Sequence, residues 1–408
     1  DSGARARGAR DRRPGISMEM TMNRREFVRN MCYGGLATFT APRVSFAQVA
    51  QNGRLVFVLL RGGFDGLAAV VPVGDPDYAV VRGAFAFKEA ELAALDDLFG
   101  LAPGLSPLRA LWDSNELAVV HAMAIPHRTR SHFDGQAILE TGLDHPAGSS
   151  DGWLNRLLQV MSGRRSGIAI AAGMPLSLSG PFQVESWSPT QLGAVDDAFL
   201  ERLAVLYRAD AALHNRFEAA LQQQELVGEE PMARGTARRG GITPLMQAAA
   251  RILRQDQGPN IAAMEFSGWD THANQGMAGG ALDRLLGQLA EGLVAFRTTM
   301  GPAWQTTTVV VMTEFGRTAR PNGTRGTDHG TAGAGFVLGP RLARAHVVSD
   351  WPGLAQNTLY EGRDLKPTID TRAVLKAALA GTFDLTSAQL DRVFPNSSAV
   401  RPSTGLMT

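Results

Sequence analysis

Runs of consecutive apolar residues recur along this chain, and most of them end at a glycine, a proline or a charged residue. The first run, Arg54–Leu60, shows no alternation of apolar and polar positions, as is typical of a strand buried on both faces of a parallel sheet. Five further runs also predict strands: 116–124, 167–172, 261–266, 307–312 and 335–338.

Between these strands the sequence predicts helices. Ala281–Met300 carries apolar residues near i, i+3 and i+4 spacing, the pattern of an amphipathic helix. Shorter helical stretches are expected within 85–111, 132–141, 153–161, 243–255 and 370–379. Strands that alternate with helices indicate an α/β fold, so we predict a three-layer α/β/α sandwich with a mostly parallel central sheet. Residues from about 198 to 258 look like a helical insertion into a single domain of residues 48–408.

The composition permits this fold and narrows the function. Hydrophobic residues make up 44% and charged residues 19% of 408 positions, a globular balance that can fill one large domain. The sequence contains no run of about 18 apolar residues, so we expect no membrane span. Residues 1–47 hold nine Arg and four acidic residues, which leaves 31 basic and 35 acidic residues, a net charge of −4, in the remainder. This mildly acidic body argues against nucleic acid as a partner.

The first 47 residues resemble an export signal. Asn23–Val28 is a twin-arginine pattern, a modest apolar region follows, and a small-x-small cleavage site ends at Ala47. The alternative is a basic tail with a chance arginine pair, and residues before Met22 could precede the true start. The single cysteine, Cys32, falls inside this segment, so we expect no disulfides or thiolate ligands in the mature protein. We predict the twin-arginine export machinery as a partner and a periplasmic or secreted location.

Candidate metal ligands follow two of the predicted strands. Asp65 lies in a Gly-Gly-Phe-Asp-Gly motif after the first strand, and its alternative role is to close a turn. Asp270 and His272 lie two positions apart after the fourth strand, so in an extended chain they share one side. A carboxylate and an imidazole suit Zn²⁺ or Mn²⁺, although a lone His272 would more often be structural. Ligands of open α/β sheets gather at the carboxyl ends of strands.

Further acidic and imidazole side chains follow the fifth strand. Glu314 is the first charged residue after it, and its alternative is a local salt bridge with Arg317 or Arg320. Asp328 and His329 lie in a Gly- and Thr-rich loop before the sixth strand, where Asp328 could instead cap a turn. The recurrence of ligand-type residues beside successive strands favours one oxygen and nitrogen metal site.

Ser131 is the candidate nucleophile. It follows the second strand and would begin the next helix, where backbone N–H groups and the helix dipole favour anions. A nearby metal would lower the pKa of its hydroxyl. The alternative is a helix cap, because Ser131 and Asp134 have the spacing of a capping box, and the two roles are compatible. Thr129 is the second candidate nucleophile.

Four arginines flank these motifs. Paired guanidinium N–H groups suit a phosphate or sulfate, although exposed arginines are usually only solvated surface. The candidates for anion binding are Arg61, Arg128, Arg130 and Arg317.

Together these motifs resemble the family catalogued as domain of unknown function 1501. The matching segments are 59–67, 75–78, 130–134, 268–272, 313–318 and 326–330. That family in turn resembles the alkaline phosphatase/sulfatase superfamily. Members of the superfamily hydrolyse phosphate or sulfate esters with one or two metals and a Ser, Thr or modified nucleophile. The resemblance therefore implies an alkaline-phosphatase-like fold.

The superfamily pattern, carried over residue by residue, implies two metal sites. The first would hold Asp270, His272 and His329. The second would hold Asp65, Glu314 and the hydroxyl of Ser131. In an alternative alignment, Asp328 and His329 form the superfamily's Asp-His pair themselves.

The chain departs from that pattern at two points. Phe315 stands where a histidine would follow Glu314, so the second site has fewer nitrogen ligands and favours Mg²⁺, Mn²⁺ or Ca²⁺ over Zn²⁺. We expect one or two divalent metals, with Zn, Mn, Mg and Ca as candidates. The sulfatase motif has Pro two and Arg four positions after the nucleophile, where Phe133 and Gly135 follow Ser131 here. A formylglycine sulfatase is therefore disfavoured.

These patterns predict an exported, metal-dependent hydrolase that acts on a small anionic ester of phosphate, sulfate or phosphonate through Ser131. The alternative is a non-catalytic exported binding or assembly protein on the same fold. In either case we expect no nucleic-acid partner and no membrane span in the mature protein.

Overall fold

A computed structural model describes residues 53–128, 130–146, 150–162, 165–189 and 241–408, with scattered positions between 200 and 221. The predicted signal segment 1–47, the candidate nucleophile Thr129 and most of the predicted insertion lie outside the described residues. The elements below all belong to the unit Gln48–Thr408. Within the described part of the chain, no helix combines the length and apolarity that crossing a membrane requires.

A nine-stranded sheet of described residues forms the centre of this unit. Its order is β11-β5-β10-β9-β1-β8-β6-β7, with β12 also beside β5. The first strand, β1 (Arg54–Arg61), lies between β9 (Thr307–Met312) and β8 (Ile261–Ser267) and runs parallel to both. Among the described strands of this sheet, β10 (Gly333–Leu338) alone runs antiparallel to its neighbours. The mostly parallel sheet predicted from the sequence is confirmed.

The other strands of the sheet are shorter or lie nearer its edges. They are β5 (Leu117–Ala124), β6 (Gly167–Ile170), β7 (Glu185–Trp187), β11 (Val347–Val348) and β12 (Ile369–Asp370). A separate three-stranded sheet holds β2 (Val70–Val71), β4 (Gly100–Leu101) and β3 (Ala93–Ala94). Strands of two or three residues are too short to show as hydrophobic runs, which is why the sequence did not predict them.

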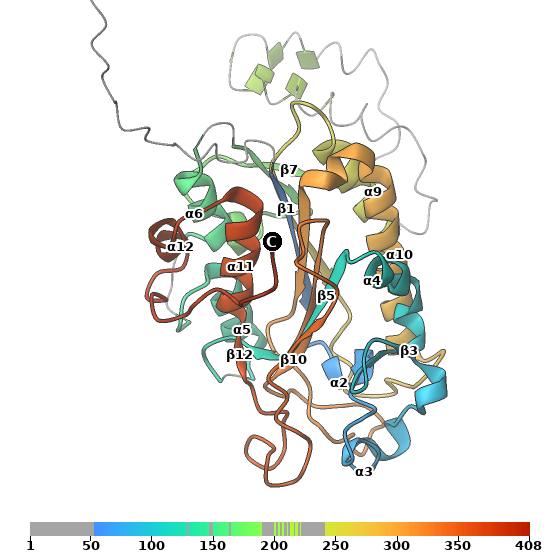
Figure 1. Ribbon diagram of the computed structural model, residues 1–408. Coiled ribbons are helices and arrows are strands. Elements are labelled where there is room, and N and C mark those ends of the chain that lie inside the picture. The colour runs from blue at the N-terminus through green and yellow to red at the C-terminus, as the bar shows by residue number, and fades with distance from the viewer. Residues whose placement is uncertain are drawn as a thin grey trace, which may run out of the picture. The chain divides into compact units, whose positions relative to one another are not determined.

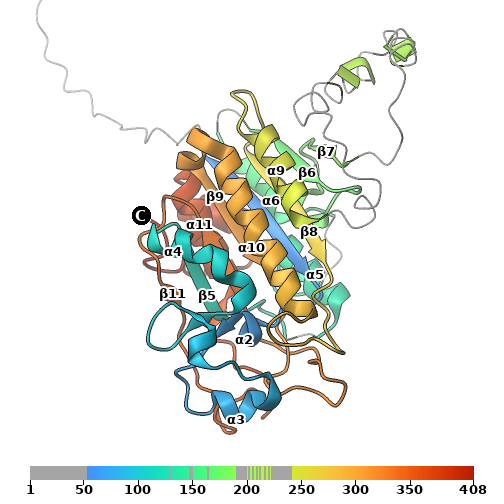
Figure 2. The ribbon, with the colours of Figure 1, turned by 90° about the vertical axis from the view of Figure 1, so that its right-hand side faces the viewer.

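Helices cover both faces of the central sheet (Figures 1 and 2). One face carries α4 (Arg109–Asp113), α9 (Ile242–Leu253) and α10 (Ala281–Met300). The other carries α5 (His132–Thr141), α6 (Trp153–Val160), α11 (Thr371–Phe383) and α12 (Ser387–Val393). Successive residues of β1 alternate between the two cores, with Val58 facing α10 and Phe57 facing α6. The predicted three-layer α/β/α sandwich is confirmed.

The stretch 85–111, predicted to contain helices, holds mostly short 3-10 turns, and Pro103 and Pro107 both lie in one of them. These turns are Gly83–Phe85, Glu89–Glu91 and Pro103–Leu108, with others at Leu176–Leu178 and Gly301–Thr306. Two short helices, α2 (Gly66–Ala69) and α3 (Tyr78–Arg82), precede them.

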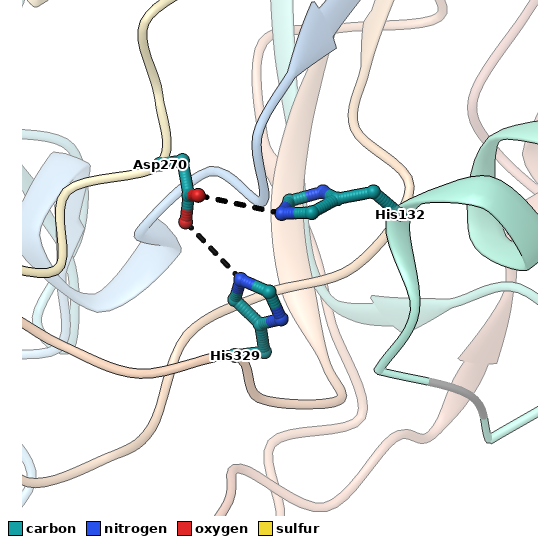
Figure 3. A group of neighbouring side chains, drawn as sticks. All are labelled: His132, Asp270 and His329. Carbon is teal, nitrogen blue, oxygen red and sulfur yellow. Dashed lines mark hydrogen bonds and ion pairs between the residues drawn. The ribbon is translucent and has the colours of Figure 1, made fainter.

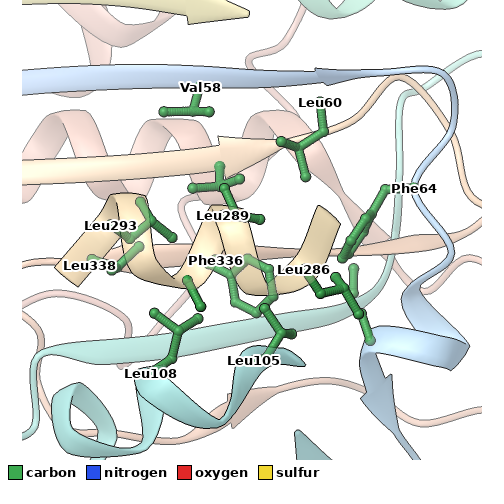
Figure 4. Packing of buried hydrophobic residues seen from close by; sticks show 14 of the residues in the cluster. Val58, Leu60, Phe64, Leu105, Leu108, Leu286, Leu289, Leu293, Phe336 and Leu338 are labelled. Carbon is green, nitrogen blue, oxygen red and sulfur yellow. The ribbon is translucent and has the colours of Figure 1, made fainter. Parts of the chain in front are cut away.

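The core under α10 anchors the turns that follow the strands (Figure 4). Phe64, just after β1, packs edge-on against Trp269, just after β8, with ring centroids 5.3 Å apart. Phe64 also packs against Phe336 of β10 at 6.2 Å. Leu289 of α10 is fully buried in the same cluster, so its truncation to alanine would cost about 2–5 kcal/mol. Apolar packing therefore fixes these turns relative to one another.

A bulge interrupts β5 shortly before its carboxyl end. The register against β10 shifts there, and Ala122 adopts a φ of +54°. Nδ1 of His121 accepts the Ala122 N–H at 2.8 Å, and its Nε2 lies 3.1 Å from the Val70 carbonyl oxygen, to which it donates. The imidazole thus replaces a lost ladder partner. Because the ring is fully buried, the pKa of His121 is lowered to about 4.

Candidate metal centre

Three connecting segments at the carboxyl edge of the sheet bring four side chains together. His132 begins α5 after β5, Asp270 and His272 follow β8, and His329 lies between β9 and β10. His132, Asp270 and His329 each offer a ligand atom, and these atoms all lie within 4.8 Å of one another. Figure 3 shows the two rings and the carboxylate pointing toward one another. Nε2 of His272 is not part of this group but lies beside two of its members, 2.9 Å from His329 Nε2 and 3.0 Å from Asp270 Oδ1.

We call the four residues His132, Asp270, His272 and His329 the open pocket. Each of its three imidazoles is held through Nδ1. His132 donates to Glu314 Oε1 at 2.9 Å, His272 donates to Asp328 Oδ1 at 3.1 Å, and His329 donates to the Arg130 carbonyl oxygen at 2.8 Å. Carboxylates and carbonyls only accept, so each neutral ring carries its proton on Nδ1 and keeps a lone pair on Nε2. All three Nε2 lone pairs are therefore available to a metal.

Without a cation, the lone pairs on these nitrogen and oxygen atoms would repel one another. Nε2 of His272 and Nε2 of His329 are 2.9 Å apart, and Asp270 Oδ1 lies 3.0 and 3.1 Å from them. Neighbouring ligands of a tetrahedral zinc, with bonds of about 2.0–2.1 Å, lie about 3.3 Å apart. Nε2 of His132 is buried without a hydrogen-bond partner among the described residues, 3.5 Å from Asp270 Oδ2. The donor set therefore fits a divalent metal.

The charge states of the pocket also suit a metal, which binds neutral imidazole and carboxylate. Burial lowers the pKa of His329, which disfavours a proton on its ring in place of a metal. Burial tends to raise the pKa of Asp270, but the hydrogen bond and charge of Arg317 outweigh it and lower that pKa. A hydrogen bond from Asn322 lowers the pKa of Asp328. Both carboxyl groups are ionised at neutral pH.

Ser131 is the N-cap of α5 and directly precedes His132 of the pocket in the sequence. Its Oγ accepts the Asp134 N–H across a long 3.4 Å, so the predicted cap is present. The next residue, His132, is a candidate ligand, which keeps the Ser131 hydroxyl one residue from the pocket. The role of Ser131 as a helix cap is compatible with a role as nucleophile, and the nucleophilic role stays a prediction.

Asp65, predicted to be a ligand, lies instead in a sealed network with Arg82 and Gln275. Its residue is only 1% exposed. Oδ2 is 2.8 Å from Arg82 Nη2 and 2.8 Å from Gln275 Nε2, while Oδ1 accepts the Ala68 N–H at 3.2 Å. Internal donors use both oxygens, and the carboxylate caps α2, so we leave Asp65 out of the proposed metal centre.

Glu314 and Asp328, also predicted to be ligands, contact the outer nitrogens of the histidines. Glu314 is fully buried and accepts from the Gly62 N–H at 2.9 Å and from Gln136 at 3.1 Å, besides His132. With this many donors around it, Glu314 orients His132 instead of facing the pocket. The side chain of Asp328 is half exposed and holds His272 in the same way.

The four arginines predicted to bind an anion all contact groups of the protein itself. Their carboxylate partners are Glu140 and Glu265 for Arg61, Glu361 and Asp364 for Arg130, and Asp270 for Arg317. Arg128 donates to the carbonyl of Ile125. The described contacts therefore give no direct support to an anion-binding role for these arginines.

His132 is the pocket residue that sequence reasoning missed. The chemistry of the segment 130–134 was assigned to Ser131, and its neighbour received no role. The available signal was position, since His132 follows β5 at the same edge of the sheet as the other ligands.

Comparison with solved structures gives weak likenesses. The chain is 13% identical to the PsFucS1 sulfatase from Pseudoalteromonas sp., with a TM-score of 0.35 over 74% of this chain, and it spans 65% of that protein, less than two thirds. For the C-terminal periplasmic domain of EcEptC from Escherichia coli, in a complex with Zn, the identity is 10% and the TM-score 0.36, over 71% of this chain and 73% of that one. For the lipoteichoic acid synthase LtaP from Listeria monocytogenes, the identity is 10% and the TM-score 0.34, over 74% of this chain and 68% of that one.

Likenesses this weak leave the activity to be inferred from the site itself. No curated protein matches the sequence. One family model does, described as a protein of unknown function (DUF1501), and it covers residues 107–394, which include all four residues of the open pocket but not Asp65. The chain therefore belongs to the DUF1501 family.

Proposed function

We propose that this protein is a metal-dependent hydrolase of a phosphate ester or a related anionic ester of sulfate or phosphonate. The observation that carries the proposal is the convergence of three Nε2 lone pairs and the Asp270 carboxylate, one residue from the Ser131 hydroxyl. His132, Asp270, His272 and His329 would hold the metal. When bound, a divalent metal supplies Lewis-acid polarisation of an ester oxygen and lowers the pKa of a nearby hydroxyl.

The chain's own residues would position the ester. Ser131 lies at the N-terminal end of α5, where backbone N–H groups and the helix dipole favour an anion. Its Oγ would attack the phosphorus in line, so that the bond from Oγ to phosphorus forms while the bond to the alcohol oxygen breaks. The departing alcohol takes up the proton that the serine gives up. Water then hydrolyses the serine ester and regenerates the hydroxyl.

The test separates the two roles of Ser131. Asparagine caps a helix about as well as serine but has no hydroxyl, so Ser131→Asn keeps the cap and removes the nucleophile. We expect Ser131→Asn to lose turnover on p-nitrophenyl phosphate, p-nitrophenyl sulfate and phenylphosphonate esters, while its metal content stays at the wild-type level. Ser131→Thr, which keeps both groups, should retain part of the activity. Unchanged turnover in Ser131→Asn would exclude Ser131 as the nucleophile.

A second candidate is a non-catalytic binding or assembly protein that keeps a metal. The pairing of three of the four arginines with carboxylates favours it, because none of those guanidiniums stands without a counter-charge to meet an anionic ester. Wild-type protein that holds a metal but turns over none of the three esters would favour this alternative.

Export as a folded protein is part of the proposal and rests on the twin-arginine pattern at Asn23–Val28. Replacing Arg24 and Arg25 together with lysine should keep the protein in the cytoplasm of its host. Export of the double variant at the wild-type level would exclude this route.

A further inference from the structure

The open pocket contains a fixed positive charge of its own. The side chain of Arg317 has no exposed surface, and its Nη1 lies 2.6 Å from Asp270 Oδ1 and 3.1 Å from the Gly62 carbonyl oxygen. Nε donates to Thr327 Oγ1 at 3.2 Å, and Nη2 donates to the Thr327 carbonyl. A guanidinium does not lose its proton in a protein, so Asp270 always has a cation beside it.

The carboxylates that the superfamily pattern would give to a second metal are already used. Asp65 is paired with the buried guanidinium of Arg82, and Glu314 accepts from four different donors. A continuous set of hydrogen bonds also joins the two arginines. Gln275 donates to Asp65 at 2.8 Å and accepts from Thr327 at 2.8 Å, and Thr327 accepts from Arg317.

We propose that the open pocket takes one divalent cation per chain, and that Arg317 supplies the positive charge that a second metal would otherwise provide. This inference rests on the proposed metal centre but not on hydrolase activity. Its physical basis is twofold. Arg317 already occupies Asp270 Oδ1, which leaves Oδ2 for one cation and no Asp270 oxygen for a second, and both oxygens of Asp65 in the sealed network are held by internal donors.

Arg317 accordingly has a positioning role and does not contact the substrate. Four oxygen atoms surround its guanidinium: Asp270 Oδ1, the Gly62 carbonyl, the Thr327 carbonyl and Thr327 Oγ1. Carboxylate, carbonyl and hydroxyl oxygens are also the ligands that hard cations such as Mg²⁺ and Ca²⁺ prefer. A space with this lining would become a cation site if the guanidinium were removed.

The first experiment counts metal atoms in the full chain. Wild-type protein is equilibrated with excess Zn²⁺ or Mn²⁺, freed of unbound metal and assayed by elemental analysis. We expect one metal per chain. Two metals per chain would overturn the inference while leaving the metal centre in place, and no metal would overturn both.

The second experiment uses two Arg317 variants and reads out metal content and melting temperature. Arg317→Lys keeps a cation, so it should still hold one metal and gain no stability from millimolar Mg²⁺ or Ca²⁺. Arg317→Ala should rise from one metal to two under those conditions, with a higher melting temperature that wild type does not show. An Arg317→Ala protein that stays at one metal and melts at the same temperature with or without these ions would overturn the inference. If Arg317→Ala does not fold, the wild-type count decides.

Discussion

Asp65 and Asp270 each follow a parallel strand of the same sheet, yet they meet different surroundings. Asp65 is only 1% exposed, and both Arg82 and Gln275 donate to its Oδ2. The side chain of Asp270 is 42% exposed and faces three imidazole rings. A strand end delivers a carboxylate to the edge of the sheet. What the carboxylate can then bind depends on whether another part of the chain covers it and supplies a counter-charge.

The largest expected effect comes from breaking the sealed network. Asp65→Ala leaves the Arg82 guanidinium buried without its partner, so the free energy of unfolding should fall by about 3–5 kcal/mol. Urea unfolding of the metal-free protein measures this. The double variant Asp65→Ala with Arg82→Met should lose less, since both charges are gone. Metal affinity of the folded Asp65→Ala protein should match wild type, and a loss of metal with stability intact would place Asp65 in the metal centre after all.

Next in size is a pH effect near the sealed network, at His121. Its folded pKa of about 4 lies below the ordinary 6.5, so the folded protein binds fewer protons than the unfolded chain between these values. Stability is therefore fully present above about pH 6.5 and falls as the pH drops toward 4, by roughly 3 kcal/mol from this group. Unfolding free energies of wild type and His121→Asn, measured across that range, should converge as the pH falls. A constant difference would refute the assignment.

A ligand of the open pocket should matter only when metal is present. With metal at about 100 times its dissociation constant, binding stabilises the fold by about 2.7 kcal/mol, and His329→Gln should lose this amount. Without metal, its melting temperature should stay close to that of wild type. His346→Gln, a histidine outside the pocket, is the matched control. An equal loss in His329→Gln with and without metal would mean that His329 has a structural role instead.

The smallest expected effects separate the two carboxylates behind the histidines. Glu314→Gln should weaken metal binding by about 10–100-fold, because a partner that orients a ligand typically contributes this much. Asp328→Asn should weaken it less, because water can replace a half-exposed acceptor on His272. Competition with a metal indicator measures both. Equal losses of metal affinity in the two variants would show that burial of the carboxylate behind a histidine does not affect metal binding.

The long strands could be predicted from the sequence because continuous apolar runs mark them. The run 54–60 became β1 at Arg54–Arg61, and 307–312 became β9 with the same bounds. The two-residue strands β11 and β12 could not be predicted, since they owe their place to pairing with β5.

The candidate site was predictable in its residue types but not in its partners. Asp270, His272 and His329 do meet, as expected from their places at strand ends. No sequence pattern indicated that Arg82 would reach Asp65, because that contact depends on where the segment after β2 places α3. The sequence pattern also favoured Ser131 over His132. Both residues follow the same strand, but a hydroxyl at the start of a helix indicated a nucleophile, whereas a single histidine there indicated no particular role.

The pocket draws on the segments that follow β5, β8 and β9, so no part of the chain can build it alone. A nascent chain lacks the pocket until His329 has been made and the strands on either side have docked. Metal uptake would then report completed folding. A truncated chain, or one with strands out of register, would bind no metal, whereas a chain that binds metal would have folded completely.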